Sequence, residues 1–405
     1  MADRILTPAA LRHWVRMPVS GRIAVVYLLA RLVTTAFLLL AAGRSTSLSR
    51  FGVAPSLREF IVGWDGQWYW WVAVHGYPST LPVTPDGLVG ENAWAFMPVY
   101  AYVSDGVGFG DWAVGALTVS LVSGYLACLV LHRMLSPRIG ASAALWAVAF
   151  FAAGPLAALF QVGYAESLFV LLLLLALEAV LRRRYGRLYL ILPVMGFTRP
   201  SILAFALFLG LHGILRWVRR DREPLPVRHV VHIVALGVLS TVVGFAWQVI
   251  CGLVTGDPSG YLRTELAWRR NWIVDASPEF VPFEGFVRGA EFWVGRAGLP
   301  PWVGWTLLVL LVATAAVLLL RDPSVRRLGP EIRLWSASYL LYLLAVFFPQ
   351  SSTLRLLMPL TPLWGAPASS RSRLRRWGML GLCLLAQWLW ILSMYGLADT
   401  FYRIP

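Results

Sequence analysis

The chain has 405 residues, of which 58% are hydrophobic and only 14% are charged, and its mean hydropathy is +0.67. About a quarter of the residues in soluble globular proteins are charged, so this composition excludes a soluble fold and indicates a multi-pass membrane protein. The formal charge of +15 does not indicate nucleic-acid binding, because all 35 basic residues are arginines and most of them lie in short loops between apolar segments.

Apolar runs long enough to cross a bilayer recur from Ile23 to the C-terminal region. We therefore predict an all-α fold: one membrane domain over residues 1–405, a bundle of about 10 to 13 transmembrane helices. No cleavable signal peptide is expected, because the segment 1–22 is polar and rich in arginine. The predicted spans are 23–42, 112–132, 141–160, 164–181, a hairpin within 188–215, then 229–254, 301–320, 334–348, 354–369 and 377–396.

The arginines assign the two faces of the membrane. Six short loops together hold 23 arginines against 5 acids and should be cytoplasmic. They are 1–22, 132–138, 182–187, 216–228, 321–333 and 371–376. The two long loops, 43–111 and 256–300, hold 8 arginines against 12 acids and should lie outside. This places an extracytoplasmic face at the plasma membrane if the source is bacterial, or in the endoplasmic reticulum if it is eukaryotic.

The first external loop is predicted to contain an interfacial helix over residues 64–76, with the sequence WDGQWYWWVAVHG. At about 100° per residue its tryptophans share one face, expected at the level of the lipid headgroups, which holds Trp64, Gln67, Trp68 and Trp71. The other face should turn toward the protein and carries Asp65, Tyr69, Val72 and Gly76. Asp65 lies in the first turn, where the helix dipole favours an anion, so it is either an N-terminal cap or a functional carboxylate.

Two more polar residues of this loop are candidates for substrate contacts. Glu91, in GENAWAFMPVY, brings a second acid near the first, although a loop carboxylate that faces water is the alternative. His75 lies at the edge of the tryptophan face, where a structural, hydrogen-bonded histidine is the alternative.

Three arginines fall at membrane depth, and each is expected to have an anionic partner or ligand because a buried guanidinium is costly. They are Arg31, Arg199 and Arg355. Arg199 follows Gly196 at the apex of the hairpin within 188–215. A structural pair with Glu166, at the external end of the fourth span, would explain it without any substrate. Arg355 and Gln350 lie at the external start of another span, where Arg355 could instead only extend its charge toward the headgroups.

The second long loop contains YLRTELAWRRNW, an amphipathic segment suited to lie against lipid. Its Arg269 and Arg270 are interpreted as headgroup contacts. Three cysteines inside apolar runs, Cys128, Cys251 and Cys383, lack metal-ligand spacing and are predicted to be core residues. No DxD pair stands in the external loops, so we expect neither a cofactor nor an obligatory divalent ion, although Asp65 with Glu91 could bind one.

Carboxylates and membrane-depth arginines on one external face suit a particular chemistry. A lipid-borne anionic donor requires cations at its phosphate, and the acceptor requires a base. Glycosyl transfer from a polyprenyl phosphate sugar has these requirements.

Five stretches, in this order, resemble the PIG-V family of mannosyltransferases, which belongs to the wider GT-C superfamily. They are WDGQWYWWVAVHGY, ENAWAFMPVY, VGYAESLFVLLLL, GFTRPSILAF and STLRLLMPLTPLW. The resemblance implies an inverting transferase that moves mannose from a β-linked polyprenyl phosphate mannose to a lipid or lipid-linked glycan acceptor, forming an α-mannoside on the non-cytoplasmic face.

The same resemblance implies roles for individual residues. Asp65 matches the acid that serves as catalytic base, and Arg199 and Arg355 would bind the donor phosphate. Substrate-binding roles are expected for Glu91, His75, Glu166 and Gln350. The rival hypotheses are a transporter or flippase of lipid-linked sugars, and a transferase of the same superfamily that uses another polyprenyl phosphate sugar.

Overall fold

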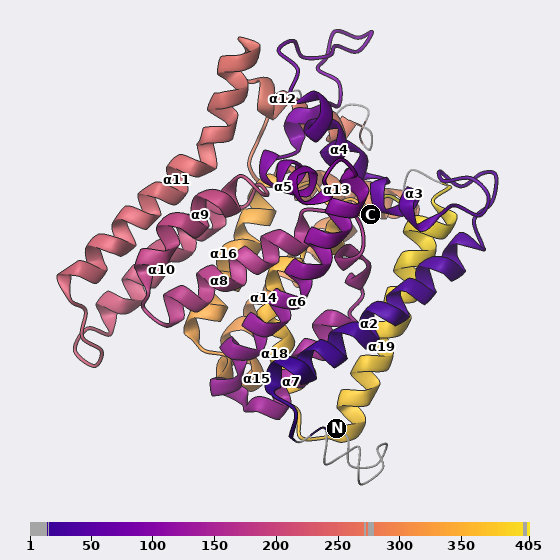
Figure 1. The fold of residues 1–405 in the computed structure, drawn as a ribbon. Helices are drawn as coiled ribbons and strands as arrows, with labels where there is room; N and C mark the ends of the chain where they lie inside the picture. The colour runs from indigo at the N-terminus through magenta and orange to yellow at the C-terminus, as the bar shows by residue number, and fades with distance from the viewer. Residues whose placement is uncertain (1–13, 15, 271–272, 274–278, 400–402) are drawn as a thin grey trace.

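The computed structural model describes residues 14, 16–270, 273, 279–399 and 403–405 (Figure 1). These residues form a helical bundle without β-strands, in which one isolated bridge joins Val83 and Val89. The N-terminal end of the described chain lies near the bottom of the view in Figure 1, and the C-terminal end lies above the middle, beside α13 and α3. The fold class is therefore all-α, as the composition predicts.

Among the described residues, five helices are long and apolar enough to cross a bilayer. They are α2 (Val19–Ala42), α6 (Trp112–Ile139), α11 (Val227–Thr255), α14 (Pro301–Arg321) and α19 (Arg373–Ile391), the last continued by a π-helical turn, η5 (Leu392–Leu397). Shorter apolar helices are α7 (Ala141–Ala152), α8 (Glu166–Leu181), α9 (Leu188–Gly196), α10 (Ile202–Val218) and α16 (Pro330–Val346). The protein is thus a multi-pass membrane protein, and the predicted hairpin within 188–215 is formed by α9 and α10.

Two predicted spans are broken. In place of one helix over 141–160, α7 ends at Ala152 and a 3₁₀ turn, η2 (Ala157–Phe160), follows. Pro155 stands in the break and has no backbone N–H to donate. In place of one helix over 354–369, the chain forms three short pieces. They are α17 (Thr353–Leu356), η4 (Met358–Trp364) and α18 (Gly365–Ala368), and three prolines in this segment prevent a continuous helix.

Among the described residues no carboxylate pairs with Arg31, for which an anionic partner or ligand was expected. Its guanidinium is buried in α2 and donates to the carbonyl oxygens of Ala152 and Ala157, the latter at 2.6 Å, and to the side-chain oxygen of Gln161 at 3.2 Å. The rings of Tyr27 and Phe160 lie 5.0 and 4.9 Å from its Cζ. The carbonyls of Ala152, at the end of α7, and of Ala157, at the start of η2, carry partial negative charge and accept from both terminal nitrogens of the arginine, while its Nε has no hydrogen-bond partner among the described residues.

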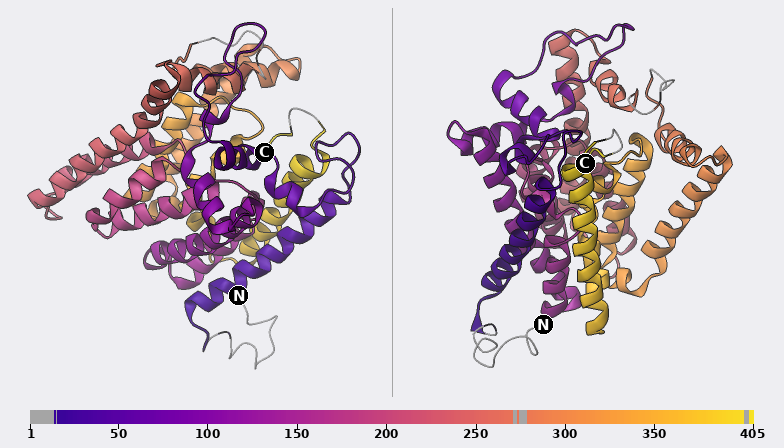
Figure 2. Two further views of the ribbon diagram at one scale, coloured as in Figure 1. Left: turned by 45° about the horizontal axis from the view of Figure 1, so that its top comes forward. Right: turned by 90° about the vertical axis from the view of Figure 1, so that its right-hand side faces the viewer.

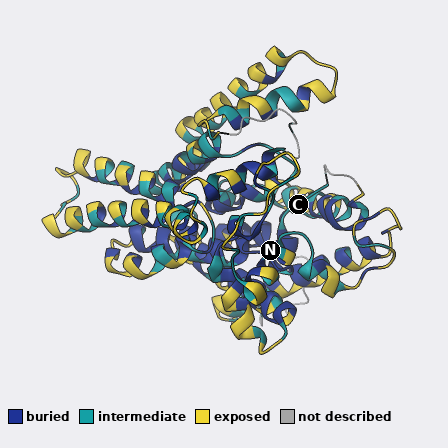
Figure 3. Cartoon of the chain, turned by 90° about the horizontal axis from the view of Figure 1, so that it is seen from above, coloured by how far each residue is buried: buried dark blue, intermediate teal, exposed yellow. Residues whose placement is uncertain are grey.

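The helices of both long loops gather at the end of the bundle opposite the N-terminus (Figures 1 and 2). The first loop forms α3 (Leu57–Val62), α4 (Asp65–His75), η1 (Ala93–Ala95) and α5 (Pro98–Gly108), and the second forms α12 (Gly260–Arg270) and α13 (Glu284–Arg296). The remaining short helices are η3 (Tyr185–Arg187) and α15 (Pro323–Arg327). Viewed from above, buried residues collect at the centre and exposed residues line the outer helices (Figure 3). The outer surfaces of α11 and α14 are apolar and exposed, as expected for helices that face lipid.

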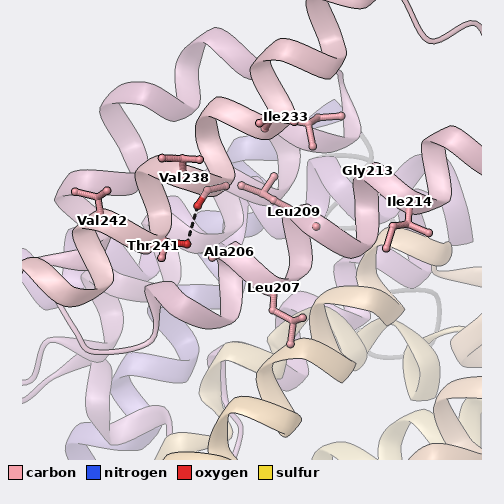
Figure 4. A pocket seen from close by; sticks show the side chains of 12 residues that line it. Ala206, Leu207, Leu209, Gly213, Ile214, Ile233, Val238, Thr241 and Val242 are labelled. Carbon is pink, nitrogen blue, oxygen red and sulfur yellow. Dashed lines mark hydrogen bonds between the residues drawn. The ribbon is translucent and has the colours of Figure 1, made fainter.

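An apolar groove of about 620 Å³ runs between α10 and α11 (Figure 4). Gly210, Gly213 and Gly237 line it and leave room between the two helices. The hydrogen bond drawn there, from the Thr241 hydroxyl to the Gly237 carbonyl at 3.0 Å, stays within α11. No charged side chain lines the groove, so it offers a surface for lipid chains and no catalytic group.

Candidate functional site

Asp65 is the first residue of α4, and an unusual backbone conformation places it there. Trp64, directly before it, has φ 53° and ψ −123°, a region that a bulky residue seldom adopts. The Trp64 indole N–H donates to the carbonyl of Met394 at 3.0 Å, and the Arg50 guanidinium lies 4.5 Å from its ring. Strained residues of this kind persist only where surrounding contacts hold them, and they cluster at functional sites.

Two glycines bring α4 against the start of α8. A Cβ atom at Gly66 would lie 2.6 Å from the Ile61 carbonyl oxygen and 3.3 Å from that of Gly163. A Cβ atom at Gly163 would also lie 2.6 Å from the Ile61 oxygen, which accepts a hydrogen bond from the Gly163 N–H at 2.9 Å. The two backbones therefore approach more closely than any side chain would permit, and Asp65 and Glu166 are brought to one place.

Four charged side chains meet there, and we call them the acid–arginine cluster: Asp65, Glu166, Arg199 and Arg355. Arg355 pairs through Nη1 with Asp65 and through Nε with Glu166, the latter at 3.2 Å. Arg199 pairs with the same Glu166 oxygen. The Arg355 Cζ also lies 5.1 Å from the Tyr164 ring. The Glu166–Arg199 pair, which the sequence analysis gave as the structural alternative, is thus present, and Arg355 turns inward to the acids rather than toward headgroups.

The cluster is enclosed but not sealed. The side chain of Glu166 is only 3% exposed, whereas those of Arg355, Arg199 and Asp65 are 11%, 13% and 21% exposed. Glu166 and Asp65 each begin a helix, where the positive end of the helix dipole stabilises a carboxylate. Burial raises the pKa of the Asp65 carboxyl above its ordinary value; the Arg355 guanidinium opposes this rise and the Glu166 charge adds to it. Asp65 is therefore a stronger base than an ordinary aspartate.

Glu265, on α12, is a further acid that the sequence reasoning did not select. Burial raises the pKa of its carboxyl to about 7, while a hydrogen bond from Tyr261 and the charges of Arg199 and Arg269 oppose the rise. The charge of Arg199, which pairs with Glu166, thus also lowers the pKa of Glu265, a residue of the second long loop. The sequence pattern that could have identified Glu265 is its spacing. Tyr261, Glu265 and Arg269 are four residues apart and therefore share one face of a helix.

The other predicted site residues lie apart from these contacts. His75 ends α4, about 15 Å along the helix from Asp65, and its ring stacks on Trp71 at 4.1 Å. Glu91 is half-buried beside Asn92, whose side chain donates to Thr264 of α12 at 2.8 Å. Gln350 lies in the turn before α17, where its backbone N–H and carbonyl both form hydrogen bonds with the Thr353 hydroxyl. Their roles in substrate binding stay predictions.

Several residues expected at the lipid surface pack against protein instead. Arg269 is buried, 3.9 Å from Glu284 of α13, and Arg270 donates to the Val89 carbonyl. Trp68 stacks on Phe96 at 5.5 Å. The headgroup interpretation is therefore wrong for Arg269, which is buried beneath α13, whereas Arg270 and Trp68 contact protein but stay partly exposed, and their lipid contacts stay predictions. The inward face of α4 is as expected, with Tyr69 and Val72 buried and Asp65 beside them.

The described residues contain no group of three or more His, Cys, Asp or Glu side chains that could hold a metal ion. The expectation that the chain needs neither a cofactor nor a divalent ion stays a prediction. The three cysteines are free and buried, as predicted.

No protein-family model and no curated protein matches the sequence, so membership of the PIG-V family stays a prediction. Two solved structures are similar to this fold. ArnT from Cupriavidus metallidurans in the apo state shares 14% identity at a TM-score of 0.45, over 88% of this chain and 61% of that one. ArnT from the same organism bound to undecaprenyl phosphate shares 16% identity at a TM-score of 0.47, over 90% and 64%. This chain spans less than two thirds of the length of those proteins, and likeness at this level carries no argument about the site.

Proposed function

We propose that this chain is a membrane glycosyltransferase that moves a sugar from a polyprenyl phosphate to a membrane-borne acceptor. The observation that carries the proposal is the acid–arginine cluster, in which a partly exposed carboxylate of raised pKa stands beside two guanidinium groups at the loop-bearing end of a membrane bundle. Transfer from a lipid-linked phosphate requires these groups and little else: a base for the acceptor and cations for the leaving phosphate.

Asp65 is the proposed general base. The acceptor hydroxyl oxygen forms a bond to the anomeric carbon while its proton passes to the Asp65 carboxylate. The bond from that carbon to the phosphate oxygen breaks on the opposite face of the sugar, and the polyprenyl phosphate leaves with the electron pair. Because the phosphate leaves as a stable anion, no general acid is required. Attack from the opposite face inverts the anomeric centre.

Arg199 and Arg355 are the proposed phosphate ligands. Each guanidinium carries five N–H donors, of which their contacts with the two acids use only a part, so both arginines have donors left for a phosphate. In the free protein Arg355 pairs with Asp65. We expect the donor phosphate to compete for Arg355, which would release the carboxylate to accept a proton only when the donor is in place.

Glu166 is proposed to hold the two arginines in position. It contacts both of them and is almost fully buried, which favours this role over the direct substrate contact expected from the sequence. Without Glu166 the guanidinium groups would repel one another across the site.

The sugar and the acceptor rest on the resemblance of the five sequence stretches to mannosyltransferases. We propose mannose as the transferred sugar, an α-mannoside as the product and a lipid or lipid-linked glycan as the acceptor. On the arginine distribution, the reaction would take place on the extracytoplasmic face.

The test is transfer of radiolabelled sugar from a panel of polyprenyl phosphate sugars to a membrane lipid extract by the purified protein. Transfer should occur with the mannose donor. The Asp65→Asn variant should lose about 10² or more of the rate, the usual contribution of general base catalysis, while still binding the donor.

Asp105→Asn is the matched control, because Asp105 is an exposed aspartate of the same loop, on α5. It should transfer at the wild-type rate. Near-normal turnover by Asp65→Asn would exclude the proposed base. Movement of a lipid-linked sugar between leaflets that survives Asp65→Asn, without any transfer, would identify a transporter instead.

A further inference from the structure

A second charged pocket lies at the far end of α8, away from the acid–arginine cluster. It measures about 180 Å³ and is lined by residues of α6, α8, η3 and α9 together with the turn between α8 and η3. Its lining contains four arginines and one acid, Arg133, Arg182, Arg184, Arg187 and Glu178. Glu178 is twelve residues after Glu166, which places the pocket about 18 Å along the helix from the cluster. It is therefore a separate site.

One acid cannot neutralise these arginines. Glu178 accepts from Arg133 at 3.0 and 2.6 Å and pairs with Arg182 at 2.9 Å, so both of its oxygens are used. In the part of the chain that the structure describes, no carboxylate pairs with Arg184 or Arg187. The pocket therefore keeps an excess of positive charge and two guanidinium groups with free donors.

The turn after α8 builds this arrangement. Arg183 has φ 56°, a left-handed conformation that usually belongs to glycine at the end of a helix. The Arg184 N–H then donates to the Ala179 carbonyl at 2.8 Å, and the Arg183 N–H to the Val180 carbonyl at 2.9 Å. These two bonds fold the chain back over the end of α8. As a result Arg184 and Arg187 face the same pocket as Arg182.

The remaining lining is apolar and adjoins the lipid-facing surface. Leu175, Ala179 and Ile191 complete the pocket, and Leu190, directly before Ile191 in α9, is 79% exposed. A free anion in water would gain nothing from an apolar wall. A lipid would place its phosphate among the arginines and its acyl chain along that wall.

We propose that this pocket binds the headgroup phosphate of an anionic glycerophospholipid. The phosphate accepts from Arg184 and Arg187, and Arg133 and Arg182 add positive charge from the Glu178 side. A zwitterionic lipid binds less well, because its quaternary ammonium group is repelled by the same guanidinium groups. The proposal is independent of the transferase function.

The experiment measures lipid bound to the purified protein by native mass spectrometry, with micelles that contain phosphatidylglycerol or phosphatidylcholine. Wild-type protein should retain phosphatidylglycerol and not phosphatidylcholine. Arg184→Gln with Arg187→Gln should weaken retention about tenfold or more, because each arginine near an anionic membrane surface contributes roughly fivefold. Since neither arginine has a carboxylate partner to lose, the double variant should melt near the wild-type temperature.

Two control variants separate the pocket from charge in general. Arg326→Gln with Arg327→Gln removes two exposed arginines of α15 that do not line the pocket, and it should retain the lipid as the wild type does. Arg184→Lys with Arg187→Lys preserves the charge and should restore most of the retention.

Three results would overturn the proposal. The first is equal retention by the wild type and the Arg184/Arg187 glutamine variant, and the second is an equal loss of retention in the α15 control. The third is displacement of the lipid by inorganic phosphate at millimolar concentration, which would identify a site for the free anion; we expect the lipid to stay bound.

Discussion

At the scale of single residues, the acid–arginine cluster is a row of ion pairs in which Asp65 pairs with Arg355, Arg355 with Glu166, and Glu166 with Arg199. Among the described residues, Glu166 pairs with both arginines, while the Asp65 side chain pairs with Arg355 only. The two acids therefore differ in surroundings although both begin a helix. This difference supports the proposed roles, in which the buried acid holds the arginines and the more exposed acid accepts a proton.

The first residue-scale prediction concerns Glu166. Glu166→Gln should destabilise the protein by roughly 3 kcal/mol, because it leaves a buried guanidinium without its partner. Arg355 would still pair with Asp65, whereas Arg199 would lose its carboxylate partner. The unpaired Arg199 should therefore account for most of the lost stability. Thermal unfolding in detergent measures the effect. Glu291→Gln, in a half-exposed pair with Arg288, should change stability by less than about 1 kcal/mol, and an equal effect in both variants would contradict the buried-charge explanation.

The second residue-scale prediction concerns the pH dependence caused by Glu265. Its pKa is raised from 4.5 to about 7 in the folded protein. A carboxyl whose pKa is raised on folding stabilises the folded state fully below the pKa that it has in the unfolded chain. This stabilisation is lost as the pH rises toward 7, the pKa in the folded protein. Glutamine is neutral throughout, so the melting temperature of Glu265→Gln minus that of the wild type should increase between about pH 5 and about pH 8. A difference that stays constant across this range would contradict the raised pKa.

At the scale of elements, the position of α4 depends on a contact between backbones. Gly66 and Gly163 allow the start of α4 to touch the segment before α8. Trp64 is held in a left-handed conformation at the same point. The geometry of the acid–arginine cluster thus depends on tertiary docking, because neither α4 nor the short helix α17 that carries Arg355 is long enough to be stable alone.

The element-scale prediction is that Gly66→Ala disrupts this docking. Its Cβ would meet the Ile61 carbonyl, a backbone atom that can move only with α3, so sugar transfer should fall by about tenfold or more. Gly106→Ala, in α5, meets no atom within 4 Å and should leave transfer unchanged. Transfer assays on both variants, with melting temperatures alongside, measure the difference. Full activity of Gly66→Ala would show that the close approach is unnecessary.

At the scale of the whole molecule, the helices of the two long loops gather at one end of the bundle (Figure 1), and the arginine pocket lies about 18 Å along α8 from the acid–arginine cluster. The arginine distribution predicts that the loop-bearing end is extracytoplasmic and that the segment 182–187, which lines the pocket, is cytoplasmic. On that predicted topology, a charge-balanced site and a positively charged pocket belong to opposite faces.

The whole-molecule prediction is tested by cysteine labelling in intact cells. Ser79→Cys, in the first long loop, should react with a membrane-impermeant maleimide, whereas Arg222→Cys, between α10 and α11, should react only after permeabilisation. Both positions are exposed, and the three native cysteines are buried, so background labelling should be low. The reverse pattern would invert the predicted topology and place the proposed reaction on the cytoplasmic face.

The sequence by itself determined the class of protein, the long spans and the four residues of the cluster. Hydrophobic length and arginine position act locally, through the cost of placing polar groups in lipid, and can be read along the chain. Only the tertiary structure decided that Arg31 donates to backbone carbonyls, that Arg355 is shared by two acids, and that Glu265 is buried with a raised pKa. These outcomes depend on which charges meet across distant loops, because the protonation and pairing of a buried group are set by its neighbours in space.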